Sequence, residues 1–333
     1  MMLASLILPD FEIGSATDAG RKRRGEANQD AVLVLPAEGS RPPLFIVADG
    51  MGGHAGGALA SKLVVETISE HYRQAGDYRD LAALLGDCLQ RANKALADRA
   101  AGQPAYSSMG STAVLAIIDG GQVYVANVGD SRAYLIRGRP AASDAPTLVR
   151  QAIQPRPALF SIRARLGRIL GGKQPRREEN KTVPVTTLAP AQVQANAPQA
   201  NLAMQQLNYD HSVVADQIRA GRLTPLQALR SPKRNRLTQS LTPRRKEITP
   251  FFCQAPFSDR DTLLLCSDGL WGVVSEAIIQ AVAQELPPQQ AAEKLVALTL
   301  ASGAPDNVSV IITRRKGGQI TISYDDDETN PGM

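Results

Sequence analysis

The stretch LFIVADGMGGH (residues 44–54) joins an apolar run to an aspartate and three glycines. A short apolar run bounded by turn residues is typical of a buried strand, and the glycines permit a sharp turn with close backbone approach. A second apolar run, AVLVL (31–35), precedes it, and glycine and proline residues separate the two. We therefore predict two successive strands, with Asp49 at the end of the second one.

Similar patterns recur along the chain. Apolar runs predict further strands at 112–118, 122–128, 132–137, 261–267 and 307–315. A 3.6-residue spacing predicts helices to about Tyr72, over 81–96, from Ser275 to Pro287, and from there to about Ser302. Asp119-Gly120-Gly121 predicts a tight hairpin. Because strands come in runs separated by pairs of helices, the pattern favours an α+β fold.

Bulk composition limits the class of protein. The chain has 333 residues, of which 43% are hydrophobic, enough for one large domain or two small ones. Its three cysteines form no CxxC pair, which argues against a disulfide framework and a zinc site. The first residues, MMLASLILPDFEIG, lack a basic start and predict a first strand rather than a secretion signal. No run approaches the roughly 18 apolar residues of a membrane span, so we expect a cytoplasmic protein.

The positive charge is concentrated in one segment. The net charge is +5, but residues 141–206 alone carry nine Lys or Arg and three acids. This segment is rich in Pro, Ala and Gln, and 182–206 has no charged residue. We predict a mostly disordered basic insertion, 141–206, in a single domain formed by 1–139 and 207–315, followed by an acidic C-terminal tail, 316–333.

The insertion leaves several interpretations open. Residues 157–173 alternate Leu, Phe and Ile with Arg in a helical rhythm. A solvated linker, a contact with an acidic protein partner or a kinase tail, and binding to an anionic membrane surface all fit this pattern. Nucleic acid is disfavoured, because aromatic residues for base stacking are nearly absent.

Aspartates at turns next to apolar runs suggest a metal site. They are Asp30, Asp49, Asp130, Asp268 and Asp306. Each alone is an ordinary turn signal. Together at one edge of a sheet they would repel one another, and a divalent cation would relieve that repulsion. Mg²⁺ and Mn²⁺ prefer such oxygen ligands. The set therefore predicts an oxygen-ligated site for two metal ions.

Eight motifs occur in the order found in one family. They are TDAG (17–20), NQD (28–30), VADGMGGH (47–54), SSMGSTA (107–113), VANVGDSRAYL (125–135), DHSVV (210–214), SDGLW (267–271) and DNVSVI (306–311). In these motifs the chain resembles the type 2C metal-dependent protein phosphatases. The resemblance implies a four-layer α-β-β-α sandwich of two antiparallel sheets flanked by helices, with the metals at one rim. It also implies that residues 211–241 form the mobile flap and the segment after it.

The same resemblance assigns roles to matching positions. Asp49 would bridge two Mn²⁺ or Mg²⁺ ions, with the Gly50 carbonyl as a further ligand. Asp268 and Asp306 would hold one ion and Asp30 the other. Asp130 matches an acidic residue at an accessory third metal. Two such cations activate a water molecule for attack on phosphorus.

Some positions depart from the family pattern. The phosphate-binding arginine of the family falls here on Gly25, so we assign that role to Arg24, one residue away; a solvated basic turn at 21–24 is the alternative. His54 fits a structural or water-ordering role as well as a catalytic one, since the family's proton donor falls on Met51. We expect Trp271 to belong to the core.

The implied activity is hydrolysis of phosphoserine and phosphothreonine in proteins. As a protein serine/threonine phosphatase, the chain would act on phosphorylated protein substrates, oppose a cognate kinase and take part in signal transduction. A catalytically silent, phosphoprotein-binding module is the alternative, and a missing metal aspartate would favour it. None is missing.

Overall fold

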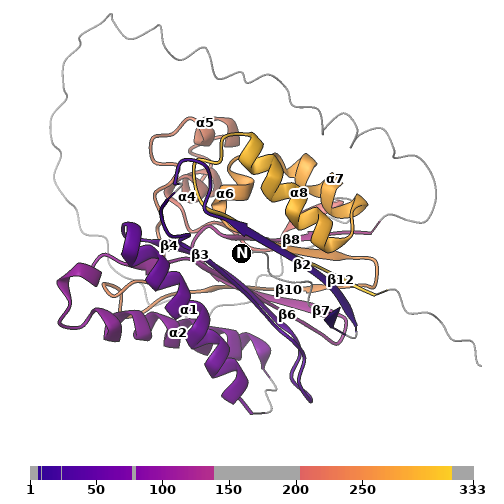
Figure 1. The fold of residues 1–333 in the computed structure, drawn as a ribbon, viewed down its shortest axis with the longest axis horizontal. Coiled ribbons are helices and arrows are strands. Elements are labelled where there is room, and N and C mark those ends of the chain that lie inside the picture. Colours follow the sequence, from indigo (N-terminus) through magenta and orange to yellow (C-terminus); the bar gives the residue numbers. More distant parts are fainter. Residues whose placement is uncertain (1–6, 9, 24, 77–79, 139–202, 317–333) are drawn as a thin grey trace, which may run out of the picture.

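Two antiparallel sheets form the centre of the molecule in the computed structural model, which describes residues 7–8, 10–23, 25–76, 80–138 and 203–316 (Figure 1). The first sheet has the order β1 (Ile7–Leu8), β2 (Phe11–Asp18), β12 (Val308–Arg315), β11 (Thr262–Cys266), β8 (Arg132–Ile136), β9 (Met204–Gln206). The second has the order β10 (Phe251–Pro256), β7 (Gln122–Val128), β6 (Ala113–Asp119), β4 (Leu44–Met51), β3 (Asp30–Leu35), and the short β5 (Gly110–Ser111) pairs with β4.

Helices cover the outer face of each sheet (Figure 1). On the second sheet lie α1 (His54–Gln74) and α2 (Leu81–Ala100). On the first lie α6 (Asp268–Trp271), α7 (Glu276–Glu285) and α8 (Pro288–Ala301). Two short helices, α4 (Val213–Arg219) and α5 (Pro225–Leu229), lie in the connection from β9 to β10, and a 3₁₀ turn (Pro104–Tyr106) follows α2. None of the described helices is long and apolar enough to cross a bilayer.

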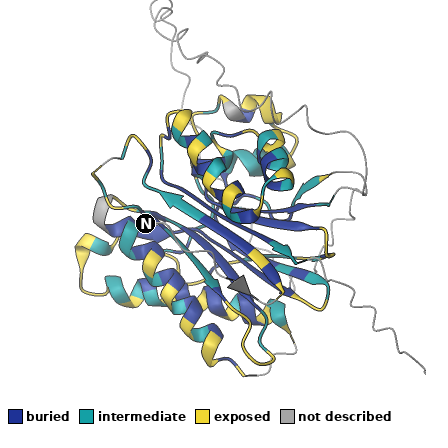
Figure 2. Cartoon of the chain, turned by 45° about the vertical axis from the view of Figure 1, so that its right-hand side comes forward, coloured by how far each residue is buried: buried dark blue, intermediate teal, exposed yellow. Residues whose placement is uncertain are grey.

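The alternation of side chains along each strand produces the layers. In β4, Leu44 and Ile46 pack toward α1 and α2, whereas Phe45 and Val47 pack toward the first sheet. This is the two-residue period of a strand that is buried on both faces. Figure 2 shows the strands buried and the outer helix surfaces exposed. The predicted four-layer α-β-β-α sandwich is thus confirmed.

Most predicted elements are present with shifted ends. The hairpin between β6 and β7 has the two-residue loop Gly120-Gly121, with φ of +53° and +78°. Positive φ at both loop residues matches the right-handed twist of the paired strands. Ser275 precedes α7 as predicted, but its side chain makes no capping hydrogen bond.

Two differences concern strands. β10 was not predicted, because FFCQAP includes a proline and shows no regular alternation. β9 lies inside the range 141–206 and pairs with β8, so the predicted boundary at residue 206 is wrong for its last residues. The composition of β9 lacks strong apolar character, but its pairing with the buried strand β8 holds it in the sheet. The rest of that range, up to residue 202, and the tail from 317 lie outside the described residues.

Strand register brings distant aspartates to one rim. Asp30, the first residue of β3, lies directly opposite Asp49 in β4. β11 ends at Cys266 just before Asp268, and its antiparallel neighbour β12 begins at Val308 just after Asp306. The strand ends next to these four aspartates therefore lie together at one edge of the two sheets, which we call the rim.

Candidate metal centre

Five buried or half-buried aspartates gather at this rim. Burial raises the pKa of Asp49 well above its ordinary value, and the nearby carboxylates of Asp30, Asp268, Asp130 and Asp306 raise it further. These residues come from β3, β4, the turn after β7, the start of α6 and the turn before β12. The structure therefore brings together all five aspartates that the sequence singled out.

Burial and mutual repulsion also raise the pKa values of three further aspartates in this cluster. Burial raises the pKa of Asp30 to about 7 and that of Asp268 to about 6, with contributions from Asp306 in both cases. The pKa of Asp130 is also raised well above its ordinary value, mainly by burial and by Asp268. Each shift has the direction expected for carboxylates that lack a compensating cation.

Unsatisfied oxygen atoms show that the residues present fit a divalent cation. Oδ1 of Asp30 and Oδ1 of Asp268 are buried and have no hydrogen-bond partner. Within the described residues, no three His, Cys, Asp or Glu side chains form a ready-made cage for one ion. A cation at this rim would complete its shell with backbone oxygen and water, as Mg²⁺ commonly does.

Glycine is required where β4 meets α1. A Cβ at Gly50 would lie 2.0 Å from the carbonyl oxygen of Gly57, so no larger residue fits there. The Gly50 amide donates to the carbonyl of Gln29 (3.0 Å). With the Gln29 amide oriented to suit its neighbours, its nitrogen donates to the Gly50 carbonyl oxygen (3.2 Å) and its oxygen accepts from Arg23 (3.0 Å). The predicted backbone ligand is thus held beside the aspartates.

Hydroxyl groups fix the backbone of Asp49, a role that the sequence analysis did not assign to them. The Asp49 amide donates to Thr112 Oγ1 (3.0 Å), and Ser111 Oγ donates to the Asp49 carbonyl (3.0 Å). Thr112 Oγ1 in turn shares a hydrogen bond with Ser131 Oγ (2.7 Å). Their only signal was their place in the motifs SSMGSTA and VGDSRAYL.

The basic turn contributes an arginine to the rim. Arg23 Nη2 lies 2.8 Å from Asp306 Oδ1, in an ion pair in which both side chains are about one-third exposed. Arg24, to which the sequence assigned phosphate binding, lies outside the described residues, as does the side chain of His54.

A second charged cluster lies next to the rim. Arg132 forms two hydrogen bonds with Asp210, Nε to Oδ1 (2.9 Å) and Nη2 to Oδ2 (2.7 Å). Its guanidinium also stacks 3.6 Å from the centre of the Trp271 ring, and the Trp271 indole donates to the Asp130 carbonyl (3.0 Å). Trp271 is half-buried and packs against the core between the first sheet and its helices, so its predicted place in the core holds in part. It also joins the two clusters.

Comparison with known proteins agrees with this geometry. The family model described as protein phosphatase 2C matches residues 18–147. Protein phosphatase PhpP of Streptococcus pneumoniae is 30% identical over 306 residues, which cover 91% of this chain and 96% of that protein. The chain belongs to the protein phosphatase 2C family. A further relative in this group, serine/threonine phosphatase stp of Listeria innocua, is 27% identical over 90% of this chain and 94% of its own length.

Solved structures share the fold. The serine/threonine phosphatase PstP/Ppp of Mycobacterium tuberculosis has a TM-score of 0.65 at 25% identity and covers 92% of this chain and 100% of its own. A structure of the PstP catalytic domain in complex with two manganese ions has a TM-score of 0.63 at 24% identity, covering 92% and 99%. The two-sheet architecture of this protein phosphatase 2C chain is therefore that of its solved relatives.

Proposed function

We propose that this chain is a metal-dependent protein serine/threonine phosphatase that hydrolyses phosphoserine and phosphothreonine in proteins. The observation that carries the proposal is the group of five aspartates at one rim, two of which present a buried oxygen without a partner. A stable fold seldom leaves such groups unpaired unless they serve a function. Membership of the protein phosphatase 2C family and the activities named for its relatives support the same reading.

The rim residues would divide the work of holding two Mn²⁺ or Mg²⁺ ions. Asp49 would contact both ions, and the Gly50 carbonyl would be a further ligand. Asp268 and Asp306 would hold one ion and Asp30 the other. Asp130 would serve an accessory third ion. When bound, the cation pair supplies an activated water and offsets the negative charge of the phosphoryl group. The two manganese ions in the PstP catalytic domain are consistent with this proposal.

The chain's own residues prepare this site before any ion arrives. Thr112 and Ser111 hold the backbone of Asp49, and Ser267 Oγ donates to Asp30 Oδ2 (2.8 Å). Fixed carboxylates lose little freedom when they bind a cation. Arg23 lies at the same rim, where its guanidinium fork would bind the substrate phosphate. The family resemblance assigns the same role to Arg24.

A cysteine-based mechanism finds no support in the structure. Burial raises the pKa of the Cys88 thiol to about 12, and it also raises the pKa values of Cys253 and Cys266. A nucleophilic cysteine needs the opposite shift, toward the thiolate.

The decisive experiment is hydrolysis of a phosphothreonine peptide with Mn²⁺, with Mg²⁺ and with EDTA. We expect turnover with either metal and none with EDTA. Metal and phosphopeptide binding without turnover would instead identify a catalytically silent, phosphoprotein-binding module.

Three finer assignments rest on the family resemblance and on composition. We propose that the enzyme opposes a Ser/Thr kinase in signal transduction and works in the cytoplasm. We further propose that the basic segment within 141–206 contacts an acidic partner or an anionic membrane surface, because nine of its residues are Lys or Arg. Cell fractionation with and without this segment would test both the location and the contact.

A further inference from the structure

The connection that contains α4 and α5 has an unusual charge. Residues 217–246 contain no Asp or Glu, and nine of the thirty are Lys or Arg. All nine are exposed. They are Arg219, Arg222, Arg230, Lys233, Arg234, Arg236, Arg244, Arg245 and Lys246. We call this segment the basic flap. Because a basic run is often no more than a solvated surface, its contacts and position decide whether it does anything else.

Within the part of the chain that the structure describes, most of these cations have no acidic partner. Arg219 pairs with Asp216, whereas Arg244 and Arg245 donate only to the carbonyls of Ser107 and Thr238. For the other six, the described part of the chain provides no side-chain hydrogen bond or ion pair. These six are Arg222, Arg230, Lys233, Arg234, Arg236 and Lys246. The basic flap therefore presents net positive charge to solvent.

The chain is fixed at the metal rim just before the basic flap and again near its end. Before the flap begins, the His211 amide donates to the Gly129 carbonyl (2.9 Å) and the Gly129 amide donates to His211 Nδ1 (3.1 Å). Burial lowers the pKa of His211 to about 4, so the ring accepts this hydrogen bond as a neutral imidazole. Gly129 immediately precedes Asp130.

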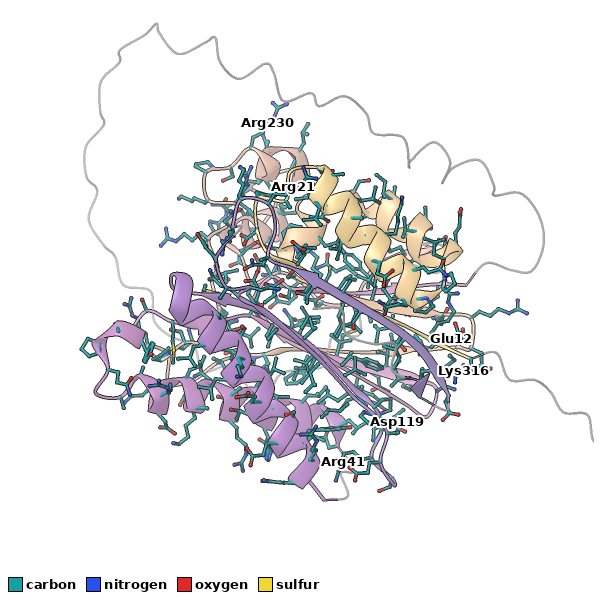
Figure 3. All side chains as sticks on the ribbon, viewed as in Figure 1. Glu12, Arg21, Arg41, Asp119, Arg230 and Lys316 are labelled. Atoms are coloured by element: carbon teal, nitrogen blue, oxygen red, sulfur yellow. The ribbon has the colours of Figure 1, made fainter. Side chains whose placement is uncertain are left out.

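At the other end, Leu241 exchanges two backbone hydrogen bonds with Ser111, each of 2.9 Å. Ser111 in turn contacts the carbonyl of Asp49. The basic flap therefore runs beside the rim. In Figure 3, Arg230 and Arg21 lie at one end of the molecule, and Asp119 and Lys316 lie toward the other.

An apolar side chain accompanies the charge. Leu226 in α5 is 64% exposed, and it is the one exposed large hydrophobic side chain among the described residues. It lies between Arg222 and Arg230 in the sequence. An exposed leucine among free guanidinium groups is a combination suited to a peptide with acidic residues and one apolar side chain.

We propose that the basic flap docks an acidic, Asp- or Glu-rich segment of the phosphoprotein substrate and so selects phosphorylation sites in acidic surroundings. Guanidinium groups would pair with the carboxylates, and Leu226 would contact an apolar side chain of the same segment. This inference rests on the proposed phosphatase function, and it adds the substrate class.

The test compares two phosphothreonine peptides that differ only in four flanking residues, Glu in one and Gln in the other. We expect the acidic peptide to have a kcat/KM about tenfold higher at low salt, since several exposed ion pairs of modest strength act together. The ratio of the two kcat/KM values should fall toward one at about 0.5 M NaCl, because salt screens these ion pairs strongly at that concentration.

Substitutions test whether the basic flap causes the preference for the acidic peptide. The triple variant Arg230→Gln, Lys233→Gln, Arg234→Gln should reduce the ratio of the two kcat/KM values by about fivefold. A matched control, Arg73→Gln, Arg260→Gln, Lys316→Gln, removes the same charge from positions away from the rim and should leave the ratio unchanged. Leu226→Ser should lower kcat/KM for the acidic peptide by about threefold.

The outcomes separate the two proposals. Equal hydrolysis of both peptides, or equal effects of the two triple variants, would refute acidic docking while leaving the phosphatase function intact. A preference that emerges only after removal of 317–333 would mean that the chain's own acidic residues occupy the basic flap, and the proposal would be wrong. If neither peptide is hydrolysed, the phosphatase function fails. Fluorescence anisotropy with a non-hydrolysable acidic peptide then still tests docking, because the triple variant must weaken binding and its control must not.

Discussion

Asp130 and Asp210 are both buried acids in neighbouring clusters, yet their surroundings differ. Asp210 receives two hydrogen bonds from the Arg132 guanidinium, which also contacts Tyr134 and Glu276. Asp130 faces Asp268 and other carboxylates, and its pKa is raised. The cluster of Asp210 has a largely buried counter-charge, whereas the five aspartates of the rim have only the partly exposed ion pair of Arg23 with Asp306. The difference teaches that the fold can balance a buried acid here, so the imbalance at the rim is a feature of the site and not of poor packing.

The strongest way to test the comparison is to remove the central acid of the rim. Asp49→Asn keeps the shape of the side chain but removes the charge that would bridge two cations. We expect turnover of a phosphothreonine peptide to fall by about a thousandfold, or roughly 4 kcal/mol of barrier. Circular dichroism should show an intact fold. Asp119→Asn, at the hairpin between β6 and β7, is the control and should keep full activity. An active Asp49→Asn enzyme would rule out the metal centre.

Breaking the balanced cluster should harm stability more than chemistry. Arg132→Met leaves Asp210 buried without its counter-charge, and we expect a loss of about 3 kcal/mol in the free energy of unfolding, measured in urea. The double variant Arg132→Met, Asp210→Leu should recover most of that loss. A single variant as stable as the parent would show that the pair contributes nothing.

Removing one rim charge should stabilise the metal-free protein, whereas Arg132→Met should destabilise it. The pKa of Asp30 is raised to about 7 from 3.8, so the folded state holds a proton that the unfolded state has released between these pH values. Stability in EDTA therefore falls as pH rises from about 4 to 7, and little of this penalty remains below pH 4. Asp30→Asn should raise Tm in EDTA at pH 7.5 by about 3 °C, flatten the pH slope and weaken the stabilisation by Mn²⁺. A lower Tm in EDTA would contradict the unbalanced rim.

The smallest expected effect concerns the arginines of the basic turn. If Arg23 or Arg24 binds the substrate phosphate, its replacement by Ala should raise KM about tenfold, or roughly 1.4 kcal/mol, with a smaller change in kcat. Arg21→Ala is the matched control in the same turn. Equal small effects at all three positions would support a solvated turn.

The sequence predicted the α+β fold class and singled out the five aspartates that lie together at the rim, because both depend on local patterns. Apolar runs and turn residues identify strands such as 44–51, and an acid at each turn is visible without coordinates. Relations set by tertiary contact were not visible. The ion pair of Arg132 with Asp210 joins residues 78 positions apart, and the hydroxyls of Thr112 and Ser131 meet across two strands. β9 depends on a partner strand rather than on its own residues.

Trp271 is the only tryptophan of the chain, and it touches both clusters. Its ring lies against the Arg132 guanidinium and its indole nitrogen donates to the carbonyl of Asp130. Indole emission responds to nearby charge and to hydrogen bonding, so this residue is a built-in optical reporter. A cation that settles at the rim should change the emission without any added label, and the titration curve gives its affinity directly. Because Arg132→Met removes the stacked charge and leaves the indole in place, the same signal also separates rim loading from disturbance of the neighbouring ion pair.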